Sequence, residues 1–156
     1  MEYSKNDFVD YYFKFKELVL LHRKLNFGSN PHIPSVFSES IVKNLAGYSN
    51  WENKDFDAKT ENSLGVEIKA TGTENGTTTI NIEKLTKSEF SHIEWIYMNF
   101  STDEFTIKII EKDALSEFVQ SEANKKERPS ITLNQYEYSS MLKYKFKKEH
   151  DIEQIN

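Results

Sequence analysis

The apolar residues of this chain change their spacing near residue 47, and this change restricts the fold more than any other feature. Before that point they recur at steps of three and four, the period of a helix with one buried face. After it, apolar and polar residues alternate over short segments bounded by turn residues, as in half-buried strands. This order of segments predicts an α/β fold in which helices flank a small mixed β-sheet.

Two helices are predicted before the first strand. In the first, over residues 4–25, Ser4 and Asp7 resemble a capping box. The second covers residues 35–46 and has Gly47 in the position of a C-terminal cap. The buried face of the first helix is expected to consist of its regularly spaced apolar residues, which are Phe8, Tyr11, Phe15, Leu18, Leu21 and Leu25.

The elements predicted further along the chain are shorter. We expect a polar loop or hairpin tip over residues 71–81, and a basic aromatic segment of uncertain type follows a polar stretch near the end. The remaining predicted elements are strands at 55–59, 65–71, 92–100, 105–111 and 130–133 and helices at 82–90 and 112–123.

Length and composition indicate one soluble domain over residues 1–156. The chain is 37% hydrophobic and 13% aromatic, which argues against disorder. It contains neither a run of about 18 apolar residues nor the pattern of a signal peptide. Its lack of cysteine excludes a disulfide framework, a thiolate zinc site and a cysteine nucleophile, so we expect a cytoplasmic protein.

The charge is unevenly distributed. A net charge of -5 is unfavourable for a protein that binds DNA phosphates, yet residues 123–148 hold seven basic residues and two acidic ones. This basic C-terminal part is therefore a candidate for DNA contact. The basic residues are Lys125, Lys126, Arg128, Lys143, Lys145, Lys147 and Lys148.

Familiar catalytic motifs are mostly missing. The chain has no phosphate-binding loop, no dinucleotide fingerprint, no nucleophile elbow and no His-Glu-x-x-His. His92 and Glu94 have the spacing used by zinc deaminases, but the partner cysteines do not exist here. The four histidines are expected in surface or capping positions rather than as metal ligands.

Three Glu/Asp-x-Lys triplets occur, and only one lies within a clear alternation. In that one, Glu67 and Lys69 are predicted to point to the same face of a strand, opposite Val66, Ile68 and Ala70. The three triplets are Glu52-Asn53-Lys54, Asp57-Ala58-Lys59 and Glu67-Ile68-Lys69.

A carboxylate beside an ammonium group suits phosphodiester hydrolysis, which needs a divalent cation on oxygen ligands, a water nucleophile and neutralisation of phosphate charge. Asp57 can supply a second carboxylate if residues 60–63 form the turn of a hairpin. Asp55 competes for this position, although the ten-residue spacing to Glu67 favours Asp57. Glu39 is expected near the apolar face of its helix, where an acid needs a partner.

Asp57, then nine residues, then Glu67-Ile68-Lys69 resembles the PD-(D/E)xK signature of the restriction-endonuclease-like nucleases. Phe56 stands where the proline would be. The resemblance covers residues 35–112 as the catalytic core and implies a type II restriction endonuclease that cuts both DNA strands with Mg²⁺. It implies that Asp57 and Glu67 bind the metal, that Lys69 handles the attacking water and that Glu39 supports the metal site.

Other interpretations stay open. Asp57, Glu67 and Lys69 would also fit a surface ladder of ion pairs, which are common across strands and contribute only ~0.2–1 kcal/mol each. A nuclease of this type could instead act on branched or damaged DNA, or the chain could be a catalytically silent DNA-binding module.

For double-stranded DNA we expect contacts from the loop after residue 71 and from the C-terminal third. Because one chain offers one active site, cutting both strands favours a homodimer, through either the first helix or the aromatic segment 136–146. The predicted DNA contacts are Thr73, Asn75, Thr77, Thr78, Thr79, Lys125, Lys126, Arg128, Asn134 and Gln135.

Overall fold

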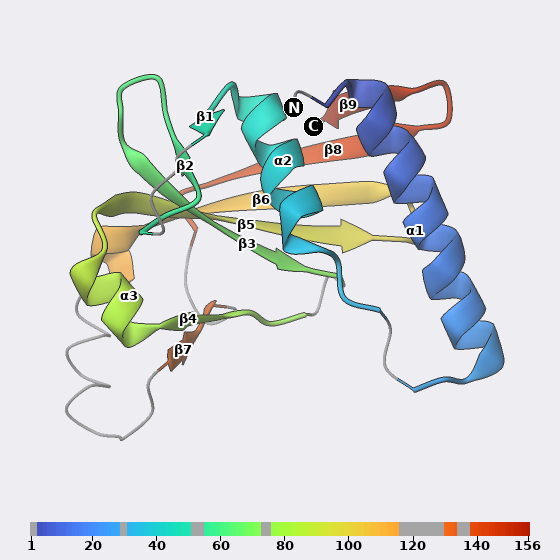
Figure 1. Ribbon diagram of the computed structural model, residues 1–156, viewed down its shortest axis with the longest axis horizontal. Helices are drawn as coiled ribbons and strands as arrows, with labels where there is room; N and C mark the ends of the chain where they lie inside the picture. The colour runs from blue at the N-terminus through green and yellow to red at the C-terminus, as the bar shows by residue number, and fades with distance from the viewer. Residues whose placement is uncertain (1–2, 29–30, 51–54, 73–75, 116–129, 134–137) are drawn as a thin grey trace.

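A mixed β-sheet with strand order β1-β2-β3-β5-β6-β8-β9 forms the centre of the fold (Figure 1). The computed structural model describes residues 3–28, 31–50, 55–72, 76–115, 130–133 and 138–156. Neighbouring strands are antiparallel except β3 and β5, which run parallel. The strands are β1 (Ser49–Asn50), β2 (Ala58–Lys59), β3 (Gly65–Thr71), β5 (Phe90–Asn99), β6 (Glu104–Glu111), β8 (Ser140–Lys147) and β9 (Asp151–Ile155).

Both faces of the sheet are covered. Helices α1 (Lys5–Leu25) and α2 (Ser35–Ala46) pack on one face, where they share a core with β3, β5, β6, β8 and β9. The other face carries α3 (Ile82–Lys87) and a two-stranded sheet of β4 (Thr79–Asn81) and β7 (Ser130–Thr132). The predicted α/β class, with a mixed sheet between flanking helices, is therefore confirmed.

The predicted boundaries of the first two helices are confirmed. The Ser4 side chain accepts a hydrogen bond from the Asp7 backbone N–H, and Asp7 accepts one from the Ser4 backbone, which completes the capping box. Gly47 closes α2 in the left-handed region with φ 68°. Capping interactions therefore mark the start of α1 and the end of α2.

The buried face of α1 differs from the prediction. Phe8 and Phe15 are buried as expected, together with Val9, Tyr12 and Val19. Tyr12 stacks on Phe146 with ring centroids 3.9 Å apart, which centres the core-facing side of the helix on this tyrosine. Four of the residues expected inside are exposed, and they are Tyr11, Leu18, Leu21 and Leu25.

The C-terminal segment, whose type the sequence left uncertain, forms the antiparallel hairpin β8–β9. Tyr144 and Phe146 point into the core shared with α1 and α2, while Lys143 remains exposed. The alternation Lys-Tyr-Lys-Phe-Lys over residues 143–147 is thus that of a half-buried strand. Because both aromatic side chains are buried in their own chain, they are not available for a dimer contact.

Other elements differ in length from the prediction. The strand expected at 55–59 is reduced to β2, the helix expected at 82–90 ends at Lys87, and the loop expected at 71–81 contains β4. Residues 112–115 are helical, and 116–123 lie outside the described residues. No helix in the described ranges is both long and apolar enough to span a membrane.

Gly65, the first residue of β3, lies where the chain is too crowded for a side chain. A Cβ atom there would be 2.9 Å from ring atoms of Phe56 and 3.0 Å from the Phe90 Cα, whereas at Gly72 the nearest atoms are 3.8 Å away. We expect Gly65→Ala to lower the free energy of unfolding by about 1–3 kcal/mol. Gly72→Ala is the control, and urea denaturation of both variants measures the difference. Equal stability of the two variants would contradict this packing.

Candidate functional site

The outer edge of β3 is paired with another strand only at its beginning. β2 pairs with Gly65 and Val66, and no strand pairs with this edge of residues 67–71 in the described part of the chain. Asp57 continues the pairing, because its backbone N–H donates to the Val66 carbonyl at 2.9 Å and its Oδ2 accepts from the Ile68 N–H at 2.7 Å. The Asp57 carboxylate therefore accepts the hydrogen bond from Ile68 that a neighbouring strand would otherwise accept.

Glu67 is the central carboxylate of this edge and has no exposed surface. Its Oε1 accepts a hydrogen bond from Lys69 Nζ at 2.5 Å. Lys84 Nζ, from α3, lies 2.6 Å from Oε2 but outside hydrogen-bonding geometry, so that among the described residues this oxygen has an ion-pair partner and no hydrogen-bond donor. A cationic partner at each oxygen is what allows this carboxylate to be buried.

Glu39 reaches the same edge from α2. Burial raises the pKa of its carboxyl, and so do the negative charges of Asp57 and Glu67, while Lys43 and Lys69 act in the opposite direction. Lys43 Nζ lies 3.8 Å from Glu39 Oε2. The charged form of Glu39 is therefore disfavoured first by burial and then by the neighbouring carboxylates.

A cavity of about 240 Å³ brings these groups together. Because it lies at a sheet edge, elements from both faces reach it: Glu39 from α2 on one face and Lys84 from α3 on the other. The lining residues are Ile33, Ser35, Ser38, Glu39, Asp57, Glu67, Ile68, Lys69, Ala70, Thr78 and Lys84.

The four residues assigned to the site from the sequence, Asp57, Glu67, Lys69 and Glu39, all line this cavity. The predicted alternation is also confirmed, since Val66, Ile68 and Ala70 pack in the core on the opposite face. Asp55 is exposed and does not line the cavity, which favours Asp57 in the competition between them. The catalytic and metal-binding roles of these residues stay predictions.

The predicted DNA contacts are only partly within the described residues. Thr78 lines the cavity, and Thr77 and Thr79 are exposed beside it in sequence. The others lie outside the described residues, and they are Thr73, Asn75, Lys125, Lys126, Arg128, Asn134 and Gln135.

Lys84 was not singled out from the sequence. It lies 17 positions after Glu67 in a helix of six residues, and its ammonium reaches Glu67 because the crossover between β3 and β5 carries α3 over the sheet edge. Its neighbour Lys87 instead forms an exposed pair with Glu83 at 2.6 Å. The sequence signal that could have indicated Lys84 is its position in the connection that follows the candidate catalytic strand.

A second buried carboxylate, Glu94, provides a contrast. It accepts a hydrogen bond from the Tyr48 hydroxyl at 2.5 Å, and His92 Nε2 lies 3.4 Å from the same oxygen. Burial and this contact with Glu94 raise the pKa of Tyr48. Because Glu94 lies across the strand pair from Ile68 and does not line the cavity, the His92-Ile93-Glu94 triplet belongs to the core and not to the site.

The site fits a divalent cation by the chemistry of its donors. Asp57, Glu67 and Glu39 are hard oxygen ligands at one cavity, and Oε2 of Glu67 accepts no hydrogen bond from the described residues. As they stand, no three His, Cys, Asp or Glu side chains within the described ranges are arranged to hold a metal ion together. The ammonium groups of Lys69 and Lys84 would therefore have to move away from Glu67 for a cation to bind there.

Comparison with known families supplies an independent finding. The chain matches the model of the Bsp6I restriction endonuclease family over residues 2–135, which is most of its length and includes every residue of the cavity. No curated protein matches the chain. Site-specific cleavage of DNA is what this family name describes. The chain belongs to the Bsp6I restriction endonuclease family.

Proposed function

We propose that this protein is a Mg²⁺-dependent type II restriction endonuclease that hydrolyses both strands of a short double-stranded DNA site. The observation that carries the proposal is the meeting of Asp57, Glu67, Lys69 and Glu39 at one cavity on the open edge of β3. Family membership supports the nuclease activity, and the chemistry of this cavity supports its dependence on a metal.

In this proposal Asp57 and Glu67 bind the cation and Glu39 supports the site from α2. Both Glu67 oxygens already have cationic partners, at 2.5 and 2.6 Å, so the position favours positive charge on either side of this carboxylate. A bound Mg²⁺ would supply Lewis-acid chemistry, by polarising the phosphate and lowering the pKa of a bound water.

Lys69 would orient the attacking water and stabilise negative charge that develops on the phosphate. Its ammonium is held on the cavity side by Glu67, and its side chain is 24% exposed, so it remains accessible to substrate. Lys84, with a side chain 29% exposed, is placed to bind a phosphate oxygen once a cation takes over its partner Glu67.

The order of elements also supports a restriction-endonuclease-like core. Helix α2 is followed by β1, β2 and β3, and a crossover through β4 and α3 returns the chain to β5, parallel to β3. This arrangement places the acid of α2 and the two carboxylates of the hairpin at one sheet edge. The single domain, with its catalytic core over residues 35–112, stays a prediction.

DNA recognition in this proposal uses the segment after β3 and the C-terminal third. Thr78 stands at the cavity, where a side chain can contact DNA close to the cut. The loop residues and the basic residues predicted from the sequence would supply base and phosphate contacts. Because each chain has one such cavity, cutting both strands is assigned to a homodimer.

Cleavage tests the catalytic roles. Lys69→Ala and Glu67→Gln are each expected to reduce the rate of plasmid cleavage with Mg²⁺ by about 10³-fold or more, since each removes charge used in the transition state. Lys59→Ala is the control, because it changes the lysine of a neighbouring triplet that does not line the cavity. Wild-type rates in either site variant would refute the assignment. Cutting of branched or damaged duplexes alone would identify a repair nuclease instead.

Metal binding is tested without activity. Mg²⁺ is expected to raise the Tm of the wild-type protein by about 2–5 °C at saturation, because a ligand that binds only the folded state stabilises it. In Asp57→Asn the shift should be lost, while the side chain can still accept the hydrogen bond from the Ile68 N–H. An equal shift in the variant would exclude Asp57 as a ligand, and no shift in the wild type would identify a silent module.

Glu39 is predicted to stabilise the metal site and destabilise the metal-free fold. Its pKa is raised on folding, so the folded state disfavours the charged form, and this penalty is absent at acid pH and develops as pH rises through the folded pKa. Without metal, Glu39→Gln should raise the Tm at pH 8 by roughly 1–3 °C and leave it unchanged at acid pH. Cleavage should fall in the same variant. A Tm below wild type at pH 8 would contradict this prediction.

A further inference from the structure

Helix α1 carries a second apolar stripe that faces away from the core. Tyr11, Leu18, Leu21 and Leu25 are 41–50% exposed although the helix buries five other residues against the sheet. Together with Lys14 they follow steps of three and four, at positions 11, 14, 18, 21 and 25. This is the spacing at which two helices pack along a common seam.

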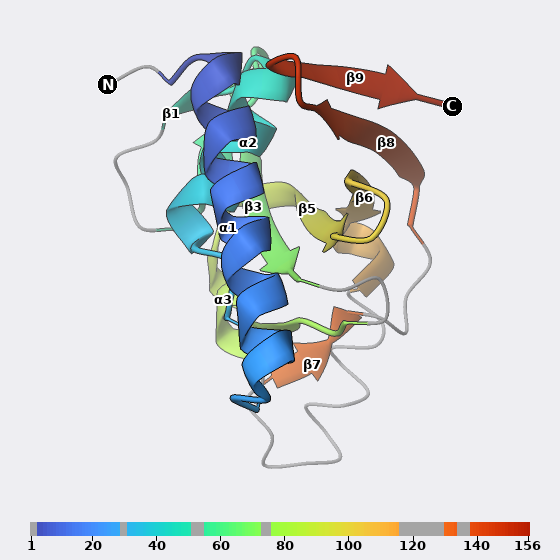
Figure 2. The ribbon, with the colours of Figure 1, turned by 90° about the vertical axis from the view of Figure 1, so that its right-hand side faces the viewer.

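The stripe is accessible in the described structure. Helix α1 runs along the outside of the molecule, and its C-terminal end extends beyond the sheet (Figures 1 and 2). Just after the helix, Phe27 is 66% exposed. Its ring lies edge-on to the ring of His22, with ring centroids 5.4 Å apart. Phe27 and the stripe together leave apolar side chains along this face open to a partner.

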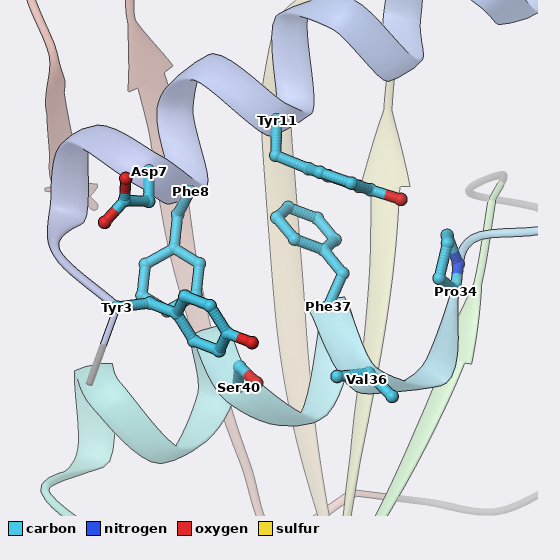
Figure 3. Close-up of a pocket in the computed structure, with 8 residues that line it drawn as sticks. All are labelled: Tyr3, Asp7, Phe8, Tyr11, Pro34, Val36, Phe37 and Ser40. Carbon is cyan, nitrogen blue, oxygen red and sulfur yellow. The ribbon is translucent and has the colours of Figure 1, made fainter. Parts of the chain in front are cut away.

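An apolar pocket lies at the other end of the stripe, between the start of α1 and α2 (Figure 3). Its volume is about 550 Å³, and Tyr11 belongs to both the pocket and the stripe. Tyr11 stacks on Phe37 with ring centroids 4.6 Å apart, which forms one wall. The remaining lining residues are Tyr3, Asp7, Phe8, Pro34, Val36 and Ser40.

The charges along α1 are complementary to those of the same helix reversed. Asp7 lies in its first turn and His22, Arg23 and Lys24 in its last. Asp10 and Lys24 stand seven residues on either side of Glu17, along one edge of the stripe. An antiparallel copy would place Lys24 beside Asp10 twice and Glu17 beside its own copy once, whereas a parallel copy would place like charges together at all three positions.

We propose that this face binds a second copy of the chain through an antiparallel, two-fold pairing of α1 with α1. Centred between Lys14 and Leu18, the pairing sets Tyr11 against Leu21 of the second copy. It also brings the exposed Leu25 and Phe27 of the second copy to the pocket between α1 and α2. Leu25 and Phe27 lie at one end of α1 and the pocket lies at the other end, so a two-fold axis fills the pockets of both copies.

The proposal rests on the proposed function, since a nuclease that cuts both strands needs two sites. It adds which surface joins the two copies and how that surface is connected to the candidate active site. Helix α2 lines both cavities: Val36, Phe37 and Ser40 face the apolar pocket, and Ser35, Ser38 and Glu39 face the carboxylates. The interface and the site therefore share one rigid helix.

Sedimentation of the full chain tests the pairing. The wild type is expected to sediment at twice its 18.3 kDa mass. Leu18→Glu with Leu21→Glu should raise the dimer Kd by ~100-fold or more, because each copy places two charges in the seam. Leu20→Glu is the matched control, as Leu20 is 47% exposed on the same helix but lies off the stripe. Circular dichroism confirms that each variant remains folded.

A charge exchange tests the antiparallel direction. Lys24→Glu alone should weaken the dimer, and adding Asp10→Lys should restore it. A monomeric wild type at about 50 µM, a dimeric Leu18/Leu21 variant or a failure of this rescue would overturn the proposal. The oligomeric state is measured without DNA, so loss of the interface and absence of cleavage are separate results. A dimer that does not cut would refute the proposed function alone.

Discussion

The hydrogen bond from the Ile68 N–H to the Asp57 carboxylate determines the character of this site. It satisfies the backbone N–H of β3 just beyond the two residues that β2 covers. A longer β2 would have buried this edge in a ladder of backbone hydrogen bonds. Instead the edge is open to α2 from one face and to α3 from the other, and acids and lysines from α2, β3, α3 and the residue before β2 meet in one cavity.

The same edge shows a conflict between stability and function. Glu67 is fully buried between two lysines, and burial together with two nearby carboxylates makes the ionisation of Glu39 unfavourable. A core built for stability alone would replace such charges with apolar side chains of similar volume. Their presence at a cavity agrees with a site whose charges are balanced by a cation and a phosphate.

The candidate site was accessible to sequence reasoning because its main residues follow a local rule. Strand alternation places Glu67 and Lys69 together, and a hairpin-sized spacing brings Asp57 beside them. Lys84 was not predicted because no sequence periodicity relates it to β3. The crossover between β3 and β5 brings it to the site. The face of α1 was mispredicted since steps of three and four describe both of its apolar stripes, and the tertiary contact of Tyr12 with Phe146 selects between them. For the C-terminal hairpin, dense lysines concealed a period of two.

Anchoring along α1 is uneven. Its first half is fixed by the core and by Asp103, which accepts hydrogen bonds from the Tyr12 hydroxyl at 2.9 Å and from Lys16 Nζ at 2.6 Å. After Val19 no residue of the helix is buried. In a lone chain the last turns therefore open at little cost in free energy, and their amide hydrogens exchange early with solvent. In the proposed dimer, order in this part of the helix would depend on protein concentration.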